Sequence, residues 1–394
     1  MTYPVSEVDF YSDVVIRDPY PFYAELRAMG PVVWLAKQNA WALTHYAEVV
    51  STLQNPDLFS SGHGLSLNDD VNKLLIGSTL NSDAPRHDQT RAITATPINR
   101  KAVLDLEPFI RRAAEGLAET LVAKGRFDAV SDLAAYLPLT IVTELVGLPD
   151  AGRENMLKWA SATFNLFDGF NARSKAAFAD LQALQAFLAQ YGQRDQLRAG
   201  GLARRIFDEG PKHGFTEGEC AQLMRDYINP SLDTTISATG YAAYLFATNP
   251  DQWDLVRADP TLVANAIEEV VRLSTPIRAF SRYVAQDTEI AGVQMAMGDR
   301  VLVVYASANR DGAVFADPDR FDVTRNTRKH VGFGHGKHLC MGLHLARLEM
   351  LCLIEAFAAR VDRWDIVGEG TRAMNNTIHA FASLPVQVTP VANL

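Results

Sequence analysis

The sequence is poor in cysteine: its 394 residues include only Cys220, Cys340 and Cys352, at wide spacings. An odd and small number of distant cysteines excludes a disulfide framework and fits a reducing, cytoplasmic setting. Basic residues are also in deficit, because 37 Lys and Arg stand against 46 Asp and Glu, a net charge of −9. Nonspecific nucleic-acid binding needs basic surface, so that function class is not expected.

Long apolar runs and linker-like segments are lacking as well. No stretch of about 18 uninterrupted apolar residues occurs, so we expect no membrane-spanning helix. The start, MTYPVSEVDFYSD, has no basic or apolar region typical of a signal peptide. No repeat and no Pro/Gly/Ser-rich tract marks a domain boundary. With 48% hydrophobic and 21% charged residues, the composition predicts a globular protein, taken as one domain over residues 1–394.

Helical periodicity dominates the chain. Helices are expected at 86–98, 100–123, 131–146, 151–168, 173–197, 217–246, 251–258, 260–274 and 341–360. Strands are expected at PVVWLA, AWALTH, within RYVAQDTEIAGVQMAMGDRVLVVY, and at LPVQVTP. Residues 60–82 lack a period and predict a long loop, often a lid or binding loop. The pattern therefore predicts a mainly α fold with small peripheral β-sheets.

The strongest chemical signal is HVGFGHGKHLCMGLHLARLEML, which places Cys340 among glycines and ahead of an amphipathic helix. The residues alone leave three interpretations open. The first is a buried small hydrophobe, as free cysteines commonly are. The second is a metal cluster with His335, His338 and His344, although this spacing crowds a tetrahedral zinc. The third is a thiolate ligand of haem iron, since a glycine-rich loop and a following helix bring backbone N–H groups to the sulfur.

This segment resembles the haem-loop signature of cytochrome P450 enzymes, F-x-x-G-x-(H/R)-x-C-x-G, at every fixed position. AIEEVVRL resembles the family's E-x-x-R as Glu269 and Arg272, and DPDRFDVTR offers Arg320 as the expected partner of that pair. The resemblance covers nearly the whole chain, from DPYPFYAELRAMGPV to SLPVQVTP. It implies haem b with Cys340 as the axial thiolate, lying between the oxygen-site helix and the cysteine-loop helix.

The resemblance also implies partners for the haem propionates, which need cationic or hydrogen-bonding groups. DAPRHDQTR is similar to the family's D-x-P-x-H-x-x-x-R and supplies His87 and Arg91. Arg282 from AFSRYV and His338 complete the implied set. From their spacing alone, His87 and Arg91 would be expected on an exposed face of a helix. Near the cysteine loop, Lys337 and Arg100 are expected to face an acidic electron-donor protein.

The stretch RDYINPSLDTTISATGYAAYLF, residues 225–246, resembles the family's oxygen-site motif (A/G)-G-x-(D/E)-T-(T/S). Asp233 and Thr234 match the acid–alcohol pair that delivers protons during oxygen activation. Pro230 and Ser231 stand where the family has a small residue and glycine. From the residues alone, Pro230 ends one helix and Asp233 caps the next. Together with the resemblance, the pattern predicts one long helix that Pro230 kinks at the oxygen site.

A substrate cavity is expected between the 60–82 loop, the end of helix 151–168, the oxygen-site helix, residues 277–280 and the turn near 378–381. The residues expected to line it are Phe164, Phe167, Asn229, Pro230, Ile277, Arg278, Phe280, His379 and Phe381. Several phenylalanines indicate a compact aromatic substrate, unless they are ordinary core residues.

GRENMLKWASATFNLFDGF and NNTIHAFASLPVQVTP resemble the soluble bacterial subgroup that oxidises para-substituted benzoates. The arginine and serines with which that subgroup binds a carboxylate are replaced by Leu74, Gly77 and Asp226. An acid at 226 would repel a benzoate if it faced the cavity. Two possibilities stay open: Arg278 or His379 binds a carboxylate, or the substrate is a neutral phenol or aryl ether.

The resemblance implies a monooxygenase that uses molecular oxygen and electrons from a ferredoxin and its NAD(P)H-dependent reductase to hydroxylate or O-dealkylate a small aromatic substrate. The chain has no dinucleotide fingerprint and too few cysteines for an iron–sulfur cluster, so the electron donor is expected to be a separate protein. The alternative is a haem protein that binds or senses a small aromatic ligand without oxidising it, which Pro230 and Ser231 would permit. Retention of both Asp233 and Thr234 favours the enzyme.

Overall fold

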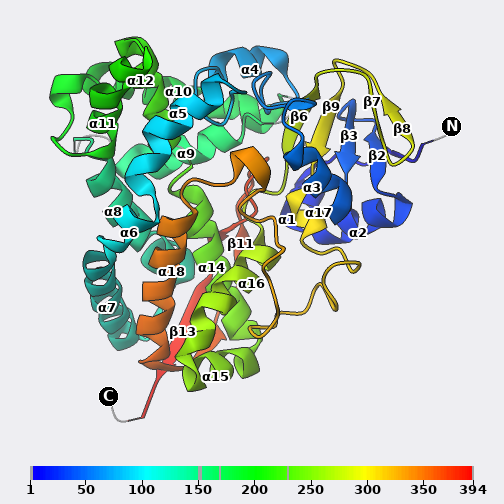
Figure 1. Ribbon diagram of the computed structural model, residues 1–394. Coiled ribbons are helices and arrows are strands. Elements are labelled where there is room, and N and C mark those ends of the chain that lie inside the picture. Colours follow the sequence, from blue (N-terminus) through cyan, green and yellow to red (C-terminus); the bar gives the residue numbers. More distant parts are fainter. Residues whose placement is uncertain (1–2, 150–152, 168–169, 229, 393–394) are drawn as a thin grey trace.

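A computed structural model describes residues 3–149, 153–167, 170–228 and 230–392. Helices form most of the molecule, and one side carries the largest sheet (Figure 1), which confirms the expected mainly α fold. The α-helices are α1 (Asp13–Arg17), α2 (Tyr20–Met29), α3 (Tyr46–Gln54), α4 (Asp69–Leu75), α5 (Arg86–Ala95), α6 (Arg100–Leu104), α7 (Glu107–Lys124), α8 (Tyr136–Val146), α9 (Met156–Phe164), α10 (Ala172–Tyr191), α11 (Leu202–Glu209), α12 (Glu217–Leu223), α13 (Arg225–Ile228), α14 (Asp233–Thr248), α15 (Pro250–Ala258), α16 (Val263–Ser274), α17 (Tyr305–Ala308) and α18 (Leu343–Ala358).

Among the described residues the strands are short and form four small sheets. They are β1 (Val5–Ser6), β2 (Val32–Leu35), β3 (Ala40–Leu43), β4 (Phe59–Ser60), β5 (Arg126–Asp128), β6 (Phe280–Val284), β7 (Thr288–Ile290), β8 (Val293–Met295), β9 (Arg300–Val303), β10 (Val361–Ile366), β11 (Thr371–Arg372), β12 (Phe381–Ser383) and β13 (Pro385–Pro390). The largest sheet has the order β1-β2-β3-β9-β6-β4, and a second has the order β10-β13-β5. In the β2–β3 hairpin Trp34 lies opposite Trp41, a cross-strand aromatic pair of the kind that stabilises sheets.

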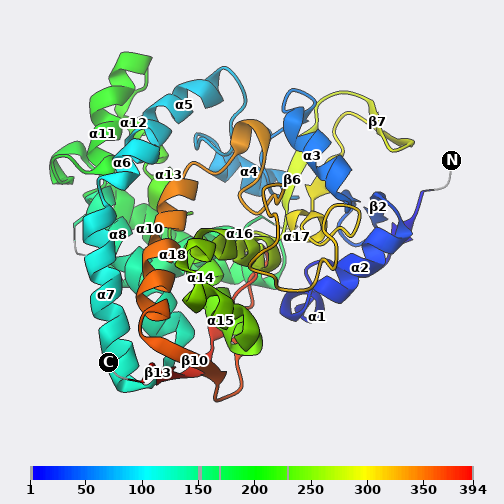
Figure 2. The same ribbon diagram turned by 60° about the horizontal axis from the view of Figure 1, so that its bottom comes forward.

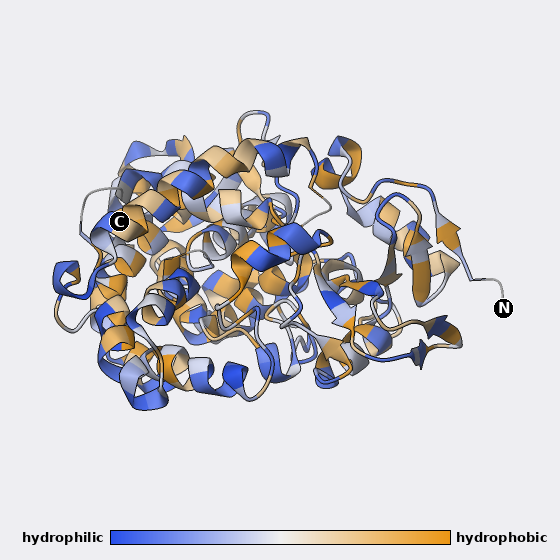
Figure 3. Ribbon diagram, turned by 90° about the horizontal axis from the view of Figure 1, so that it is seen from above, coloured by the Kyte–Doolittle hydropathy of each residue, from blue (hydrophilic) through white to orange (hydrophobic). Residues whose placement is uncertain are grey.

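The centre of the helical part is α14, which both Figure 1 and Figure 2 place beside α16. Its sequence ISATGYAAYLF is buried on almost every side, and a helix that is apolar all round belongs in a core. Small residues such as Ala238, Gly240 and Ala242 let neighbouring elements approach its backbone. Viewed from above, apolar residues concentrate inside the helical part and polar residues on its outer turns (Figure 3).

One described segment, Ala129–Val146, is long and apolar enough to cross a membrane by length and composition alone. It consists of the π-helical turn Ala129–Ala134 followed by α8, and 56% of its residues are buried inside the protein. The π-helical turn packs against α14, and α8 packs against α7 and α11. These contacts are those of a core helix pair.

Several elements of the structure differ from the prediction. The helix predicted at 217–246 is wrong as one element, because it is divided into α12, α13 and α14. Pro230 has no N–H to continue the hydrogen-bond ladder, and the helix resumes only at Asp233. The loop predicted at 60–82 contains α4, whose start is capped by the Asn68 side chain. Helix α11 was not predicted.

The E-x-x-R pair is buried as expected, with Glu269 and Arg272 fully enclosed. Arg272 donates from Nε and Nη2 to the two carboxylate oxygens of Glu269, at 2.6 and 2.7 Å. The predicted third partner is corrected: Arg325, not Arg320, donates from Nε to Glu269 Oε1 at 3.0 Å. The side chain of Arg320 is exposed, and only its backbone carbonyl joins the network, accepting from Arg272 and Arg325.

Candidate active site

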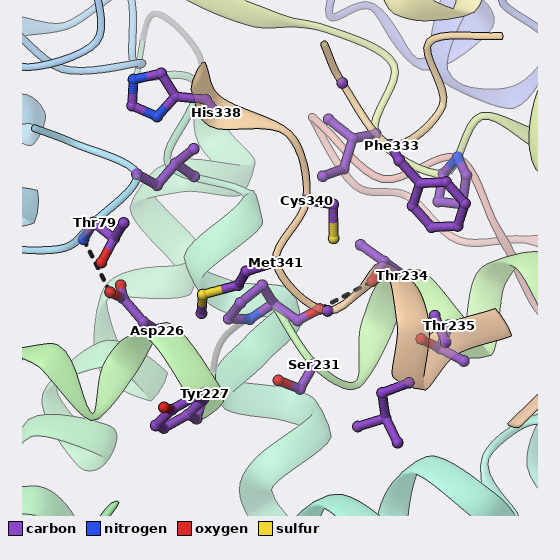
Figure 4. Close-up of a pocket in the computed structure, with 18 of the residues that line it drawn as sticks. Thr79, Asp226, Tyr227, Ser231, Thr234, Thr235, Phe333, His338, Cys340 and Met341 are labelled. Atoms are coloured by element: carbon purple, nitrogen blue, oxygen red, sulfur yellow. Dashed lines mark hydrogen bonds between the residues drawn. The ribbon is translucent and has the colours of Figure 1, made fainter. Parts of the chain in front are cut away.

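A large cavity lies where α13, the start of α14, α18 and the cysteine loop meet (Figure 4). Cys340 and Met341 reach it from the cysteine loop, and Thr234 and Ser231 from the segment that begins α14. Most of its other lining is apolar, including Leu75, Val142, Phe164, Phe280 and Leu345. Residues far apart in sequence therefore converge on one concave space, which is the usual form of a small-molecule site.

The backbone of the cysteine loop is held in a shape that requires glycine. Gly336 has a φ of +67°, and a Cβ there would overlap the carbonyl oxygen of Leu53 at the end of α3. The Cys340 amide donates to the carbonyl of Phe333 at 2.9 Å, which closes the loop. The loop therefore fixes the position of the sulfur before any ligand binds.

The thiol of Cys340 faces the start of α18. Burial raises the pKa of Cys340, while backbone hydrogen bonds from Gly342 and Leu343 act in the opposite direction. Such amides stabilise a thiolate once a metal replaces the proton. The alternative interpretation, a zinc cluster, would need His335 as a ligand. The Nε2 atom of His335 instead lies 3.0 Å from Gln54 Nε2. Over the described ranges, no group of three or more His, Cys, Asp or Glu side chains is placed to hold a metal ion.

The four expected propionate partners gather on one side of the cavity. Arg91, Arg282 and His338 line it, and the ring of His87 lies 4.4 Å from that of His338. Arg91 donates to the carbonyl of Leu339 at 2.6 Å, which ties α5 to the cysteine loop. Burial, with Arg282 nearby, lowers the pKa of His338 to about 2, and burial lowers the pKa of His87. Both rings are therefore neutral at pH 7.

These residues fit a haem. The Nε2 atoms of His87 and His338 are buried and have no hydrogen-bond partner in the part of the chain that the structure describes. Buried polar atoms are nearly always paired, so the two nitrogens indicate a polar group that fills this side of the cavity. Two arginines and two neutral imidazoles suit two carboxylates, which accept hydrogen bonds from both.

Asp233 and Thr234 lie in the first turn of α14 but face different surroundings. Thr234 lines the cavity and donates from its hydroxyl to the carbonyl of Pro230 at 2.9 Å (Figure 4). Asp233 is half-buried and accepts a hydrogen bond from Ser161 on α9. Burial raises the pKa of Asp233 to about 7, and its Oδ2 has no partner among the described residues. It is an acid that can exchange a proton near neutral pH.

The predicted aromatic lining is present. Phe164, Phe167, Pro230, Ile277 and Phe280 all face the cavity. The rings form a chain of contacts, with centroid distances of 6.2 Å between Phe164 and Phe167 and 5.1 Å between Phe167 and Phe280. The cavity therefore has one continuous aromatic wall. Asn229, also predicted here, lies outside the described residues.

Two predicted pocket residues are corrected. Arg278 is fully buried behind the cavity wall, where it donates to the Tyr23 hydroxyl and to the carbonyl of Asn376. His379 packs edge-on against Tyr20. The bridge between Ile277 and Ile378 explains both, since adjacent residues of paired extended segments point to opposite faces.

Phe381 is also outside the cavity, packed on Tyr241, Tyr244 and Arg372. Of the positions aligned with the carboxylate-binding residues, Leu74 is 50% exposed on α4 and does not line the cavity. Asp226 does line it and is 7% exposed.

One lining acid was missed by the sequence analysis. Glu349 on α18 is buried beside the cavity, its Oε1 has no partner in the described ranges, and burial raises its pKa to about 8. The sequence does contain a signal for this residue, because Glu349 lies nine positions after Cys340 on the inward row of an apolar helix.

The chain is similar to known proteins over almost its whole length. The Cytochrome P450 family model matches residues 190–360. The cytochrome P450 named CYP199A2 of Rhodopseudomonas palustris is 38% identical over 97% of this chain and 94% of its own. Linalool 8-monooxygenase of Pseudomonas putida is 30% identical over 97% of this chain and 98% of its own.

Solved structures agree with the sequence relatives. Cytochrome P450-153 from Novosphingobium aromaticivorans superposes with a TM-score of 0.85 at 27% identity, covering 97% of this chain and 99% of that one. With one relative 38% identical and another 30% identical along nearly the full length, the family is established. The chain belongs to the cytochrome P450 family of monooxygenases, which carry haem b on a cysteine thiolate.

Proposed function

We propose that the protein hydroxylates or O-dealkylates a small aromatic compound. The observation that carries this proposal is the aromatic wall of Phe164, Phe167 and Phe280, which faces the same cavity as Thr234 and Cys340. Aromatic side chains favour flat apolar ligands, because ring pairs gain free energy in offset and edge contacts beyond the burial of area. A compact aromatic ring is thus the ligand that this wall suits best.

Cys340 is proposed to bind the iron of haem b, with Arg91, Arg282, His87 and His338 as the partners of its propionates. When bound, haem with a thiolate ligand supplies the oxygen-activating chemistry, including O–O bond cleavage. The arginines contribute fixed positive charge, and the neutral imidazoles donate hydrogen bonds without adding charge. This division limits the number of buried charges that the pocket must stabilise.

Thr234 is proposed to deliver protons in the cavity and Asp233 to resupply them. The Thr234 hydroxyl is oriented by the Pro230 carbonyl, at 2.9 Å. Asp233 has a pKa of about 7 and is therefore able both to give and to regain a proton at neutral pH. Because its carboxyl accepts from Ser161, proton transfer to the cavity requires the Asp233 side chain to rotate away from α9.

A ferredoxin-type protein, reduced by an NAD(P)H-dependent reductase, is proposed as the electron donor. A groove beside α18 is lined by Arg100, Leu104, His344, Glu268 and Arg347; Arg347 donates to Glu268, and the Leu104 side chain is half exposed. Lys337 lies on the neighbouring cysteine loop. Cations around an apolar patch suit an acidic partner, because electrostatic steering raises the association rate. The few distant cysteines support a cytoplasmic location for this system.

Reconstitution tests the proposal. The haem-loaded protein is mixed with a bacterial ferredoxin, its reductase and NAD(P)H, and small phenols, aryl ethers and benzoates are supplied in turn. We expect NAD(P)H oxidation, oxygen uptake and oxidised aromatic product to rise together for at least one class. A shift in spin state without product for every compound would favour the alternative, a haem protein that only binds or senses an aromatic ligand. The carbon monoxide spectrum of the reduced protein and of Cys340→Ser serves as the control for thiolate ligation.

A further inference from the structure

Asp226 is a buried acid on the wall of the cavity. It belongs to α13, the short helix before the break at Pro230, and its side chain is 7% exposed. In Figure 4 its carboxylate lies across the cavity from Thr234 and Thr235, near the labelled Thr79. Among the lining residues that the structure describes, the other acid is Glu349, which comes from the cysteine-loop helix.

The protein's own groups only partly satisfy this carboxylate. The backbone N–H of Thr79 donates to Asp226 Oδ2 at 2.9 Å, and the Thr79 side chain is a second donor. The cations that act on it are directed elsewhere: Arg225 donates to the carbonyls of Gln222 and Ile76, and Arg91 donates to that of Leu339. A carboxylate has about four acceptor positions. The Asp226 carboxylate therefore has acceptor positions left for a ligand in the cavity.

The charge of Asp226 determines which ligands it accepts. Burial raises the pKa of Asp226 to about 6, so the group is mostly ionised at pH 7 and above. An ionised carboxylate only accepts hydrogen bonds. It repels a second carboxylate at close range, and the apolar surroundings strengthen that repulsion. A ligand that brings an O–H or N–H group gains a charge-assisted hydrogen bond instead.

We propose that Asp226 binds the substrate by accepting a hydrogen bond from a donor group on the aromatic ring, such as a phenolic hydroxyl, and that it excludes aromatic carboxylates. The inference rests on the proposed function, in which the aromatic wall takes a small aromatic compound. It selects one of the two possibilities left open by the sequence, since Arg278 and His379, the residues expected to bind a carboxylate, lie behind the wall.

Arg225 offers the competing interpretation. It also lines the cavity and is half-buried, so a benzoate would have a cation within reach if its guanidinium left the carbonyls of Gln222 and Ile76. Asp226 follows it directly in sequence, and a benzoate bound there would still approach the Asp226 carboxylate. The two interpretations predict opposite effects of substitutions at 225 and 226.

The test compares three ligands that differ in one substituent: 4-ethylphenol, ethylbenzene and 4-ethylbenzoate. Their dissociation constants are measured with the haem-loaded protein by spectral titration at pH 7.5. We expect 4-ethylphenol to bind about tenfold more tightly than ethylbenzene, as a hydrogen bond to a charged group predicts, and 4-ethylbenzoate to bind more weakly than both. Asp226→Asn, which keeps the acceptor for Thr79, should lose most of the phenol preference and strengthen benzoate binding. Arg225→Gln should leave the phenol affinity unchanged.

Each contrary outcome has a distinct meaning. A phenol affinity that Asp226→Asn does not change overturns the inference alone, as does a benzoate that binds most tightly and loses its affinity in Arg225→Gln. If none of the three ligands binds, the aromatic substrate of the proposed function fails, and this inference fails with it. An unchanged carbon monoxide spectrum in both variants shows that the pocket is loaded and folded in each comparison.

Discussion

The network around Glu269 allows a prediction from two neighbouring arginines. Arg325→Gln removes the Nε hydrogen bond to the buried Glu269 carboxylate, and with it donors to the carbonyls of Ala316, Asp317 and Arg320. Arg320→Gln is the matched control, because its side chain is exposed and its backbone carbonyl remains.

The expected loss of stability depends on the hydrogen bonds that Glu269 keeps in the variant. Removing one partner of a buried ion pair costs about 3–5 kcal/mol, but Glu269 keeps both hydrogen bonds from Arg272, so we expect roughly 3 kcal/mol. With about 2.1 cal/mol/K of unfolding entropy per residue, a chain of 394 residues has about 0.8 kcal/mol/K in total, so the melting temperature should fall by roughly 4 °C. Arg320→Gln should change it by less than about 1 °C.

The assay is thermal unfolding of the haem-loaded protein, followed by haem absorbance and far-ultraviolet circular dichroism. One fixed scan rate is used, because irreversible unfolding makes the midpoint depend on it. The reasoning is refuted if Arg320→Gln lowers the midpoint as much as Arg325→Gln, or if Arg325→Gln leaves it unchanged.

Four further predictions concern the cavity and its wall. Thr234→Ala should lower the product formed per NAD(P)H by several-fold and raise hydrogen peroxide release, measured in the reconstituted system; unchanged coupling would remove Thr234 from proton delivery. The turnover of the parent should fall as pH rises above about 7, where Asp233 loses its proton, and Asp233→Asn should be slower and lack this dependence in pH–rate profiles. The raised pKa of Asp226 means that ionising this carboxyl lowers the stability of the folded state; this cost is absent below pH 4 and complete above about pH 6. Asp226→Asn removes the cost. In urea unfolding the variant should therefore be more stable than the parent by about 3 kcal/mol at pH 7.5 and equal to it below pH 4. Arg278→Lys should lower stability but leave the affinity for 4-ethylphenol unchanged, since Arg278 holds Tyr23 behind the wall.

The predictions that agree with the structure came from motifs whose residues are close together in the sequence. The glycines and the helix around Cys340 are close in sequence, and the structure gives the physical reason for their spacing: Gly336 meets the backbone of α3, and α18 begins directly after the loop. The sequence left open whether Asp226 faces the cavity, and the structure places it on the cavity wall.

The parts that failed depend on contacts between distant segments. Arg320 and Arg325 are five residues apart in a segment without periodicity. Between them the chain turns, with Asp322 Oδ1 accepting from Thr324 N, and Arg325 is the one that reaches Glu269. Arg278 and His379 flank the Ile277–Ile378 bridge, and only the pairing of these two segments shows which neighbour faces the cavity. Neither fact is visible in local propensity.

The interruption between α13 and α14 also limits how far the folding of one helix stabilises the other. In a continuous helix the formation of one turn supports the next, whereas Pro230 has no N–H with which to pass that support on. The elements on the α13 side, α11 and α12, can therefore open as a separate unit, and their amide hydrogens should exchange faster than those of α14 in the core. We therefore expect the wall that carries Asp226 to open for ligand entry more readily than α14, which carries Thr234.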